Sequence, residues 1–298
     1  MLAAFVLFLR EGLEASLIVS ILFAALRQLG QMEKTRAVWI GVGLAILVSL
    51  IGGVAIYITI RSYDGSTFQT VFETITYLVA VVLLTTMTFW MQKHSRTLKR
   101  EIITKAGLAG SGLALGLLAF STVGREGLET AVFTLAFAFQ TSGPLLLLGA
   151  SLGLLASISL SFLVYKLGYR LDFRVFFRVM GILLLFFAAG LLGDAIQNMQ
   201  HLGWLAFGNA PMWNTARILS ENSTLGDILH TFLGYAEAPT ILQGLFYVAY
   251  LLIVGGFFAW LTRKPVLPPP ASSIKTSKSL FGNLPEAASI QGQNPISE

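Results

Sequence analysis

The chain has no cysteine, only three histidines and a charged share of only 12%. Without cysteine, disulfide bonds, thiolate metal sites and a cysteine nucleophile are excluded. Three histidines are too few for a histidine-rich metal store. An ordinary soluble domain has about 25% charged residues, so the low charge excludes a soluble globular protein, a disordered regulator and a nucleic-acid binder.

The chain is instead rich in apolar residues. Of its 298 residues, 55% are hydrophobic, and the mean hydropathy is +0.75. A helix needs about 20 apolar residues to cross a bilayer core, and seven stretches have this length. None shows the alternating pattern of a membrane barrel strand, so the sequence predicts an all-α integral membrane protein with seven transmembrane helices. The stretches are 2–26, 38–60, 72–92, 107–139, 144–165, 179–197 and 241–262.

The positions of the basic residues predict the orientation. The net charge is +5, and Lys and Arg of membrane proteins concentrate in cytoplasmic loops. Here they cluster in every second connection, whereas the loops on the opposite side have only Arg61 and Arg217. We therefore expect the N-terminus outside and the C-terminus in the cytoplasm. The basic clusters lie at 27–36, 93–105, 166–178 and 263–278.

Three segments depart from a plain bundle. As one helix, 107–139 would measure about 50 Å, and its glycine-rich start predicts a break, a tilt or close packing. The external segment 198–240 carries large apolar residues, so we expect it to lie at the membrane interface or to cap the bundle. The residues 264–298 are rich in Pro, Ser, Asn, Gln and Gly, which predicts a disordered cytoplasmic tail.

One charged pentapeptide occurs twice, as Arg10-Glu11-Gly12-Leu13-Glu14 and as Arg125-Glu126-Gly127-Leu128-Glu129. Each charge at the centre of a membrane helix costs about 2.5–3.5 kcal/mol, so three charges in one helix require a functional reason. Positions i, i+3 and i+4 place the arginine and both glutamates on one helix face. The glycine removes side-chain bulk beside the carboxylates, so that another helix or an ion can approach.

The two motif-bearing stretches enter the membrane from opposite sides in the predicted topology. This arrangement predicts an inverted repeat, with 1–105 as repeat one, 106–197 as repeat two and the seventh helix outside the repeat. Substrate sites of such transporters lie near the bilayer midplane where the two repeats meet. We therefore expect both motifs at similar depth and close together.

Carboxylates that converge in a medium of low dielectric repel one another, and the two motif arginines compensate only part of that charge. A hard or borderline multivalent cation would compensate the rest. The alternative is a buried Arg–Glu network that only joins two helices, although the motif glutamates are twice as numerous as the arginines. The candidate metal ligands are Glu11, Glu14, Glu126 and Glu129, supported by Arg10, Arg125, Gly12 and Gly127.

With these motifs in its first and fourth stretches, the chain resembles the oxidase-dependent iron permeases over residues 1 to about 263. Further matches are Phe89-Trp90-Met91, Gly193-Asp194-Ala195 and the segment 225–240. This last segment resembles most the bacterial branch of the family, which belongs to the Efe iron-uptake system. The paired motif is highly specific, whereas each of the other matches is weak alone.

The resemblance implies a high-affinity iron permease of the plasma (inner) membrane. In that family the motif glutamates bind iron as the transported substrate, and no organic cofactor is expected. It also implies a partner, either a ferroxidase or a periplasmic iron-binding or peroxidase protein. Some fungal members carry an acidic Asp-Ala-Ser-Glu stretch near the sixth helix, whereas here Asp194 is followed by no second acid. Asp194 is then either a supporting carboxylate of the iron pathway or a helix-end residue.

Other functions remain open from the residues alone. Carboxylates do not distinguish iron from manganese or zinc, so a transporter or channel for another divalent cation or for protons is an alternative. An intramembrane enzyme is disfavoured because the stretches lack a paired His, a Cys or a Ser–base set. Polar residues of the external segment would form either a shallow metal-collecting mouth or an ordinary hydrated loop. They are His201, Glu221, Asp227, His230 and Glu237.

Overall fold

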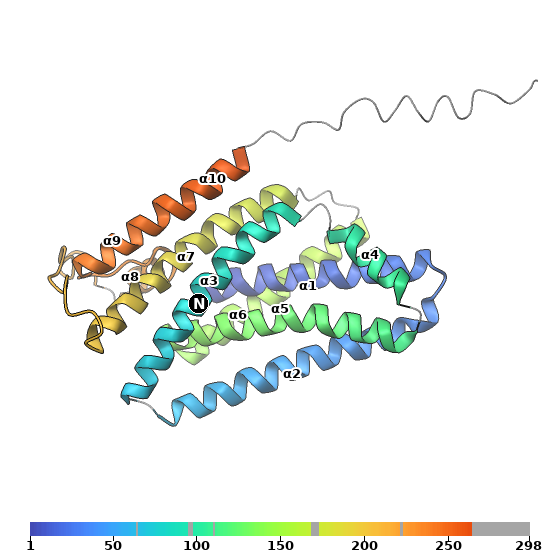
Figure 1. Ribbon diagram of the computed structural model, residues 1–298, viewed down its shortest axis with the longest axis horizontal. Coiled ribbons are helices and arrows are strands. Elements are labelled where there is room, and N and C mark those ends of the chain that lie inside the picture. The colour runs from blue at the N-terminus through green and yellow to red at the C-terminus, as the bar shows by residue number, and fades with distance from the viewer. Residues whose placement is uncertain (64, 95–97, 110, 168–172, 221–222, 264–298) are drawn as a thin grey trace, which may run out of the picture. The chain divides into compact units, whose positions relative to one another are not determined.

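The computed structural model describes residues 1–63, 65–94, 98–109, 111–167, 173–220 and 223–263, and every regular element within them is a helix (Figure 1). This confirms the prediction of an all-α protein. The predicted tail, 264–298, lies outside the described residues. The long helices are α1 (Leu2–Gln28), α2 (Thr35–Arg61), α3 (Thr67–His94), α5 (Gly112–Gln140), α6 (Gly143–Leu167) and α7 (Phe173–His201). The short elements are η1 (Met32–Lys34), α4 (Leu98–Leu108), α8 (Thr224–Leu233), α9 (Ile241–Tyr250), the π-helical turn η2 (Leu251–Gly255) and α10 (Gly256–Arg263).

Within the described residues, five helical segments are long and apolar enough to cross a membrane, as in a multi-pass membrane protein. They are Met32–Thr59, Thr67–Lys93, Gly143–Leu163, Val175–His201 and Ile241–Thr262. α1 and α5 have similar lengths, 27 and 29 residues, which correspond to about 40 Å of helix. They differ from these five segments because each carries the three charges of one motif.

The stretch predicted at 107–139 is not one helix. α4 ends at Leu108 and α5 begins at Gly112. At this start the hydroxyl of Ser111 accepts a hydrogen bond from the amide of Ala114 and thereby caps the helix. The break predicted for the glycine-rich segment is confirmed, and the long helix is Gly112–Gln140. The predicted seventh helix is continuous over Ile241–Thr262, with the π-helical turn η2 between α9 and α10.

The segment 198–240 contains α8 and folds back onto α7. α8 ends at Gly234, whose φ of +63° favours glycine. A methyl group there would lie 2.5 Å from the Cα atom of Gly190 in α7, so the two backbones touch at these glycines. The hydroxyl of Tyr235 donates to the carbonyl of Leu219 over 2.8 Å. The glycine contact holds the end of α8 against α7, and the tyrosine hydrogen bond joins two parts of the segment itself.

Three helix pairs make the most extensive contacts: α2 with α5, α1 with α6 and α3 with α7. A methyl group at Gly41 of α2 would lie 2.2 Å from the carbonyl oxygen of Gly116 in α5. The same distance separates a methyl group at Gly149 of α6 from the carbonyl oxygen of Met1. Glycine therefore permits backbone contact in both pairs. Large apolar side chains on the other faces of α2 and α6 are exposed, as expected for surfaces that face lipid.

The motifs lie between two buried apolar clusters. The first cluster joins the N-terminal half of α1 to the C-terminal half of α5, together with α3 and α7. The second joins the C-terminal half of α1 to the N-terminal halves of α2 and α5, together with α4. Since opposite halves of α1 and α5 meet, these two helices are antiparallel. Residues 10–14 and 125–129 occupy the layer between the clusters, away from both helix ends.

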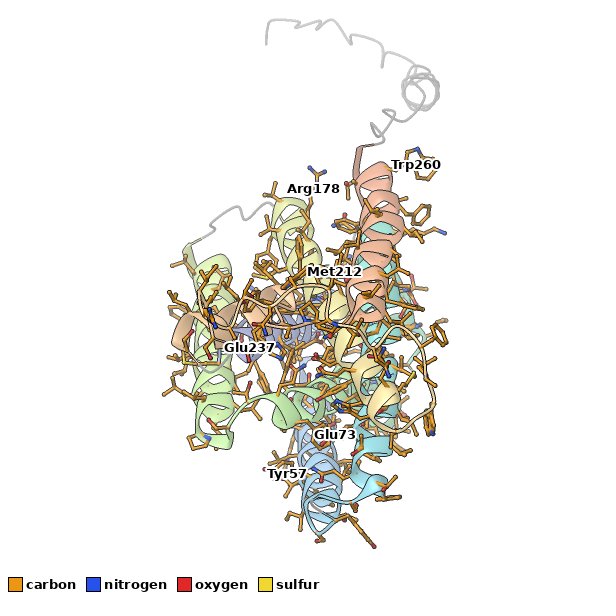
Figure 2. The ribbon with its side chains drawn as sticks, turned by 90° about the vertical axis from the view of Figure 1, so that its left-hand side faces the viewer. Tyr57, Glu73, Arg178, Met212, Glu237 and Trp260 are labelled. Carbon is orange, nitrogen blue, oxygen red and sulfur yellow. The ribbon has the colours of Figure 1, made fainter. Side chains whose placement is uncertain are left out.

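The last helix returns to the start of α7. Arg178, near that start, donates a hydrogen bond to the carbonyl of Thr262 over 3.3 Å, and Figure 2 shows Arg178 and Trp260 at one end of the bundle. Tyr57 of α2 and Glu73 of α3 lie toward the opposite end (Figure 2). α7 and α10 therefore run in opposite directions.

Candidate metal centre

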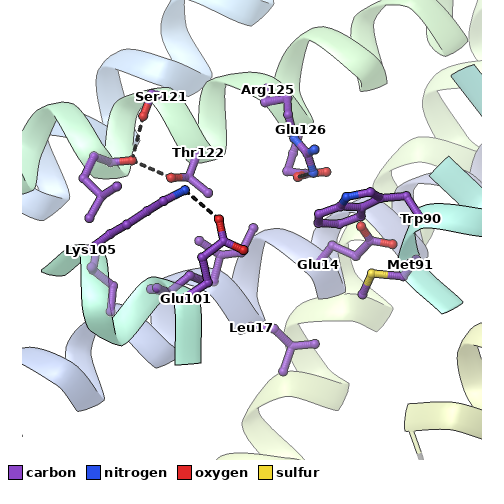
Figure 3. A pocket seen from close by; sticks show the side chains of 14 residues that line it. Glu14, Leu17, Trp90, Met91, Glu101, Lys105, Ser121, Thr122, Arg125 and Glu126 are labelled. Carbon is purple, nitrogen blue, oxygen red and sulfur yellow. Dashed lines mark hydrogen bonds and ion pairs between the residues drawn. The ribbon is translucent and has the colours of Figure 1, made fainter. Parts of the chain in front are cut away.

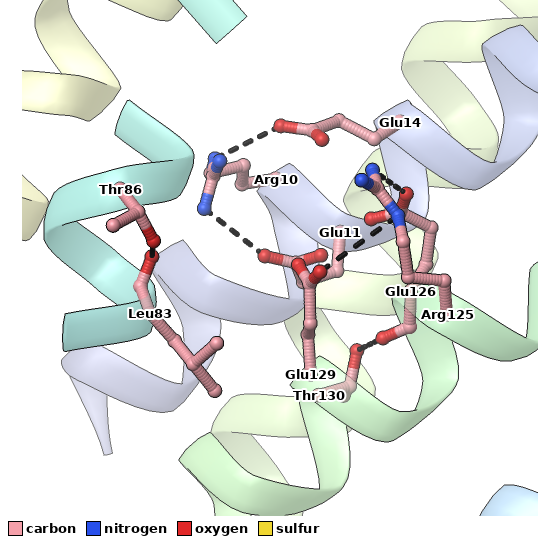
Figure 4. A network of polar contacts seen from close by, with 9 residues as sticks. All are labelled: Arg10, Glu11, Glu14, Leu83, Thr86, Arg125, Glu126, Glu129 and Thr130. Carbon is pink, nitrogen blue, oxygen red and sulfur yellow. Dashed lines mark hydrogen bonds and ion pairs between the residues drawn. The ribbon is translucent and has the colours of Figure 1, made fainter. Parts of the chain in front are cut away.

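The first motif is an almost completely buried ion-pair network inside α1. Nη1 of Arg10 lies 3.1 Å from Oε1 of Glu11, and Nε lies 2.9 Å from Oε1 of Glu14 (Figure 4). The side chains of Arg10, Glu11 and Glu14 are at most 4% exposed. The helical spacing explains the contact between Arg10 and Glu14, because residues four positions apart share one face.

The second motif, in α5, is more open. Nη2 of Arg125 lies 2.7 Å from Oε1 of Glu126, whereas its Nε lies 3.8 Å from Oε1 of Glu129. The Arg125 side chain is 46% exposed, in contrast to 2% for Arg10. Its guanidinium carbon lies 4.9 Å from the ring centroid of Trp90 in α3, close enough for a cation–π interaction.

Three glutamates from the two helices converge into what we name the glutamate cluster: Glu11, Glu126 and Glu129. One carboxylate oxygen from each lies within 4.8 Å of the others. In each residue the Oε2 atom is buried and has no hydrogen-bond partner. A buried carboxylate oxygen without a partner is costly, and a bound cation would remove that cost. The donor set consists of oxygen atoms only, which hard or borderline divalent cations accept.

Glu14 lies beside the glutamate cluster and is not one of its three members. It pairs with Arg10 and lines a neighbouring cavity together with Glu126. The structure therefore brings the four predicted glutamates into one region but gives them two environments. Four carboxylates face two guanidinium groups there, so a divalent cation would complete the charge compensation.

The motif glycines are contact sites between helices. A methyl group at Gly12 would lie 2.3 Å from Oγ of Ser157 in α6, and one at Gly127 would lie 2.2 Å from Oγ of Ser49 in α2. The sequence predicted close approach at both glycines but not the partner serines. Their identity depends on how far each helix is shifted along its neighbour, which the spacing within one helix does not define.

A cavity of about 260 Å³ adjoins the motifs (Figure 3). α1, α3, α4 and α5 form its walls, and its lining includes Glu14, Trp90, Arg125 and Glu126 as well as Glu101 of α4. Sequence analysis missed Trp90 as a partner of Arg125 and missed Glu101. The segment Phe89-Trp90-Met91 gave the only sequence signal, as part of the family resemblance.

Asp194 is separate from the glutamate cluster. Its Oδ2 atom accepts a hydrogen bond from Nε2 of Gln140 over 2.5 Å and lies 4.0 Å from Nε2 of His230. Gln140 follows Glu129 by eleven residues, about 16 Å along α5. Asp194 therefore contacts the end of α5 and the segment 198–240, not the motifs.

The predicted metal-collecting mouth does not form a compact group in the described part of the chain. Among the described residues, the glutamate cluster is the one group of three or more neighbouring acidic or histidine side chains. Nδ1 of His230 lies 2.8 Å from the carbonyl oxygen of Tyr235. Glu221 lies outside the described residues, and the side chain of Asp227 is not described.

Comparisons with known proteins agree with these observations. A model of the iron permease FTR1 family matches residues 1–263. The chain is 36% identical over 278 residues to the ferrous iron permease EfeU of Escherichia coli O157:H7, covering 92% of this chain and 98% of that protein. It is 36% identical over 258 residues to the ferrous iron permease EfeU of Yersinia pestis, covering 85% and 91%. The similar protein of Escherichia coli K12 is named putative inactive ferrous iron permease EfeU. No solved structure matches the chain.

Proposed function

The chain belongs to the iron permease FTR1 family, so it is a membrane permease and not an enzyme, and we propose that it carries ferrous iron into the cytoplasm through the glutamate cluster. The membrane would be the plasma (inner) membrane. One observation carries the proposal: one carboxylate oxygen each of Glu11, Glu126 and Glu129 lies within 4.8 Å of the others, and each of these glutamates has a buried oxygen atom without a hydrogen-bond partner. The named relatives are ferrous iron permeases.

In this proposal the glutamates replace water around the ion, and the arginines keep the carboxylates in place between transport events. Arg10 orients Glu11 and Glu14 through its two contacts. Arg125 does the same for Glu126 but holds Glu129 more loosely. Glu129 can therefore turn toward a cation without breaking a short ion pair. Asp194, which accepts a hydrogen bond from Gln140 at the end of α5, would act as a supporting carboxylate on the iron pathway.

We further propose seven spans, of which α1 and α5 are the two that carry the motif charges. Both helices are long enough to cross, and their charges lie in the middle, where they contact one another instead of lipid. The basic residues of the alternate loops support an outside N-terminus and a cytoplasmic C-terminus. Residues 264–298 would then be a disordered cytoplasmic tail.

We also propose the inverted repeat, 1–105 against 106–197, with the seventh helix outside it. The contacts support it: Gly12 with Ser157 joins α1 to α6, and Gly127 with Ser49 joins α5 to α2. Residues of α1 correspond to the residues of α5 that lie 115 positions later, and residues of α2 to the residues of α6 that lie 108 positions later. These two shifts relate the Gly12–Ser157 contact to the Gly127–Ser49 contact. The backbone contacts of Gly41 with Gly116 and of Gly149 with Met1 are related by the same shifts. In addition, α1 is antiparallel to α5, as an inverted repeat requires.

The iron would reach the outer face from a partner. The family resemblance points to a ferroxidase or to a periplasmic iron-binding or peroxidase protein. The segment 198–240, on the outer side in the proposed topology, is the part of the chain available for such a contact.

Uptake into proteoliposomes tests the proposal. The variant Glu126→Gln keeps the shape of the side chain but removes its charge, so we expect normal membrane insertion and at least about a tenfold loss of radiolabelled ferrous iron uptake. The exposed residue Glu33 provides the matched control, because Glu33→Gln removes the same charge away from the cluster.

Normal uptake by Glu126→Gln would contradict the role of the glutamate cluster. Competition with manganese and zinc in the same assay addresses the alternative cargo. If manganese or zinc competes more strongly than unlabelled ferrous iron, that metal and not iron would be the preferred substrate.

A further inference from the structure

The cavity beside the glutamate cluster ends at a carboxylate that belongs to neither motif. Glu14 and Glu126 line the cavity near the cluster, and Glu101 and Lys105 of α4 line it further along. Nζ of Lys105 lies 2.7 Å from Oε1 of Glu101, and both side chains are about half exposed. Figure 3 shows Glu101 between Lys105 on one side and Glu14 with Trp90 on the other. The cavity therefore connects the buried motifs to an exposed acidic group.

The cavity lining also offers hydroxyl oxygen atoms to a cation, from Ser121 and Thr122 of α5. The hydroxyls of Ser121 and Thr122 both donate to the carbonyl of Leu118, over 3.1 and 2.6 Å. Because their hydrogens are engaged there, the hydroxyl groups can present only oxygen lone pairs to the cavity. A cation in the cavity would thus meet acceptor atoms besides the carboxylates.

α4 is held in place by its apolar face. Ile102 and Ala106 are buried in the cluster formed with α1, α2 and α5. The cavity side of α4 carries Glu101 and Lys105 on successive turns. In the proposed topology this side of the bundle is cytoplasmic, since α4 belongs to the basic connection 93–105.

We propose that this cavity is the cytoplasmic release path for a divalent metal cation and that Glu101 is a second, transient binding carboxylate on it. The inference rests on the proposed function. One half-exposed carboxylate binds a cation far more weakly than a buried cluster of three, as release requires. An exposed Glu–Lys pair is weak, so an arriving cation displaces the ammonium group of Lys105. When the cation leaves, Lys105 pairs with Glu101 again and hinders its return.

Two matched variants distinguish the role of the Glu101 carboxylate as a ligand from the role of its ion pair with Lys105. Glu101→Gln removes the proposed ligand, whereas Lys105→Gln breaks the same ion pair and keeps the ligand. We expect Glu101→Gln to lower the initial rate of ferrous iron uptake about three- to tenfold and to leave equilibrium binding by the purified chain within about twofold. The surface control Glu33→Gln should keep uptake within about twofold of the unchanged chain, and Lys105→Gln, which leaves the carboxylate in place, should not lower the initial rate as Glu101→Gln does.

Each other outcome overturns the proposal in a recognisable way. Unchanged uptake by Glu101→Gln would remove Glu101 from the path. An equal loss in Glu101→Gln and Lys105→Gln would assign the effect to the ion pair. A joint loss of binding and uptake in Glu101→Gln would make Glu101 part of the primary site. If the unchanged chain neither binds nor takes up iron, the proposed function fails first, and the release path fails with it.

Discussion

Arg10 and Arg125 occupy equivalent positions in the two motifs but differ in their surroundings. Arg10 is 2% exposed and lies within 3.1 Å of two glutamates, whereas Arg125 is 46% exposed and lies against Trp90. Removing one partner of a buried ion pair costs about 3–5 kcal/mol because the other charge stays buried. Arg10 has two short contacts with buried glutamates, whereas Arg125 has one short contact, with the buried Glu126, and a longer one of 3.8 Å with Glu129. The two arginines are therefore unequal in their importance for stability.

We predict that Arg10→Ala lowers both the amount of protein in the membrane and iron uptake. Arg125→Ala should lower uptake with a clearly smaller loss of protein, since the Arg125 side chain is half exposed and its removal leaves one closely paired buried carboxylate, that of Glu126, instead of two. Membrane protein levels, thermal stability in detergent and uptake measure the three effects. Unchanged level and uptake of Arg10→Ala, or equal destabilisation by both variants, would contradict this asymmetry.

At the scale of the helices, glycine–serine contacts define how α1 packs on α6 and how α5 packs on α2. A methyl group at Gly12 or Gly127 would overlap the facing serine, including its Cβ atom at 2.9 and 2.8 Å. Overpacking of this kind costs about 1–3 kcal/mol. The same contacts fix the height at which the motifs meet, so packing and site geometry are coupled.

We predict that Gly12→Ala lowers the melting temperature in detergent and reduces iron uptake. Ser157→Gly removes the atoms that the new methyl group would meet, so the double variant should recover most of the stability. Gly127→Ala with Ser49→Gly should behave in the same way. Failure of either serine substitution to restore stability would show that the glycine acts by another route.

The sequence predicted the helical fold from its apolar stretches, and it predicted that the motifs meet because the two motif-bearing stretches enter the membrane from opposite sides. A period of 3.6 residues fixes which side chains share a face, so the alignment of Arg10 with Glu14 followed directly. It did not predict that Glu14 stays outside the glutamate cluster. That outcome depends on the offset between α1 and α5, a long-range property. The end of α4 at Leu108 and the contact of Trp90 with Arg125 also arise from packing.

For the whole molecule, the asymmetry of the two motifs indicates a conformation open toward α4. The cavity reaches Glu14 and Glu126 from the α4 side. An inverted repeat permits the opposite conformation by rocking one half against the other. Transport would then proceed by alternating access around the glutamate cluster.

Single cysteines in this cysteine-free chain test alternating access. We predict that Leu17→Cys, near Glu14, and Val132→Cys, near Glu129, are labelled by membrane-impermeant reagents from one side at a time. Saturating iron should change the two labelling rates in opposite senses. Simultaneous labelling from both sides, with protection of both positions by iron, would indicate a continuous channel.

The most direct test of the glutamate cluster is anaerobic binding of ferrous iron to the purified chain, with X-ray absorption of the bound metal. The unchanged chain should bind a single iron with high affinity in a ligand shell of oxygen atoms only. A folded variant that combines Glu11→Gln, Glu126→Gln and Glu129→Gln should lose this iron. Undiminished binding by that variant would contradict the assignment of the cluster as the iron site.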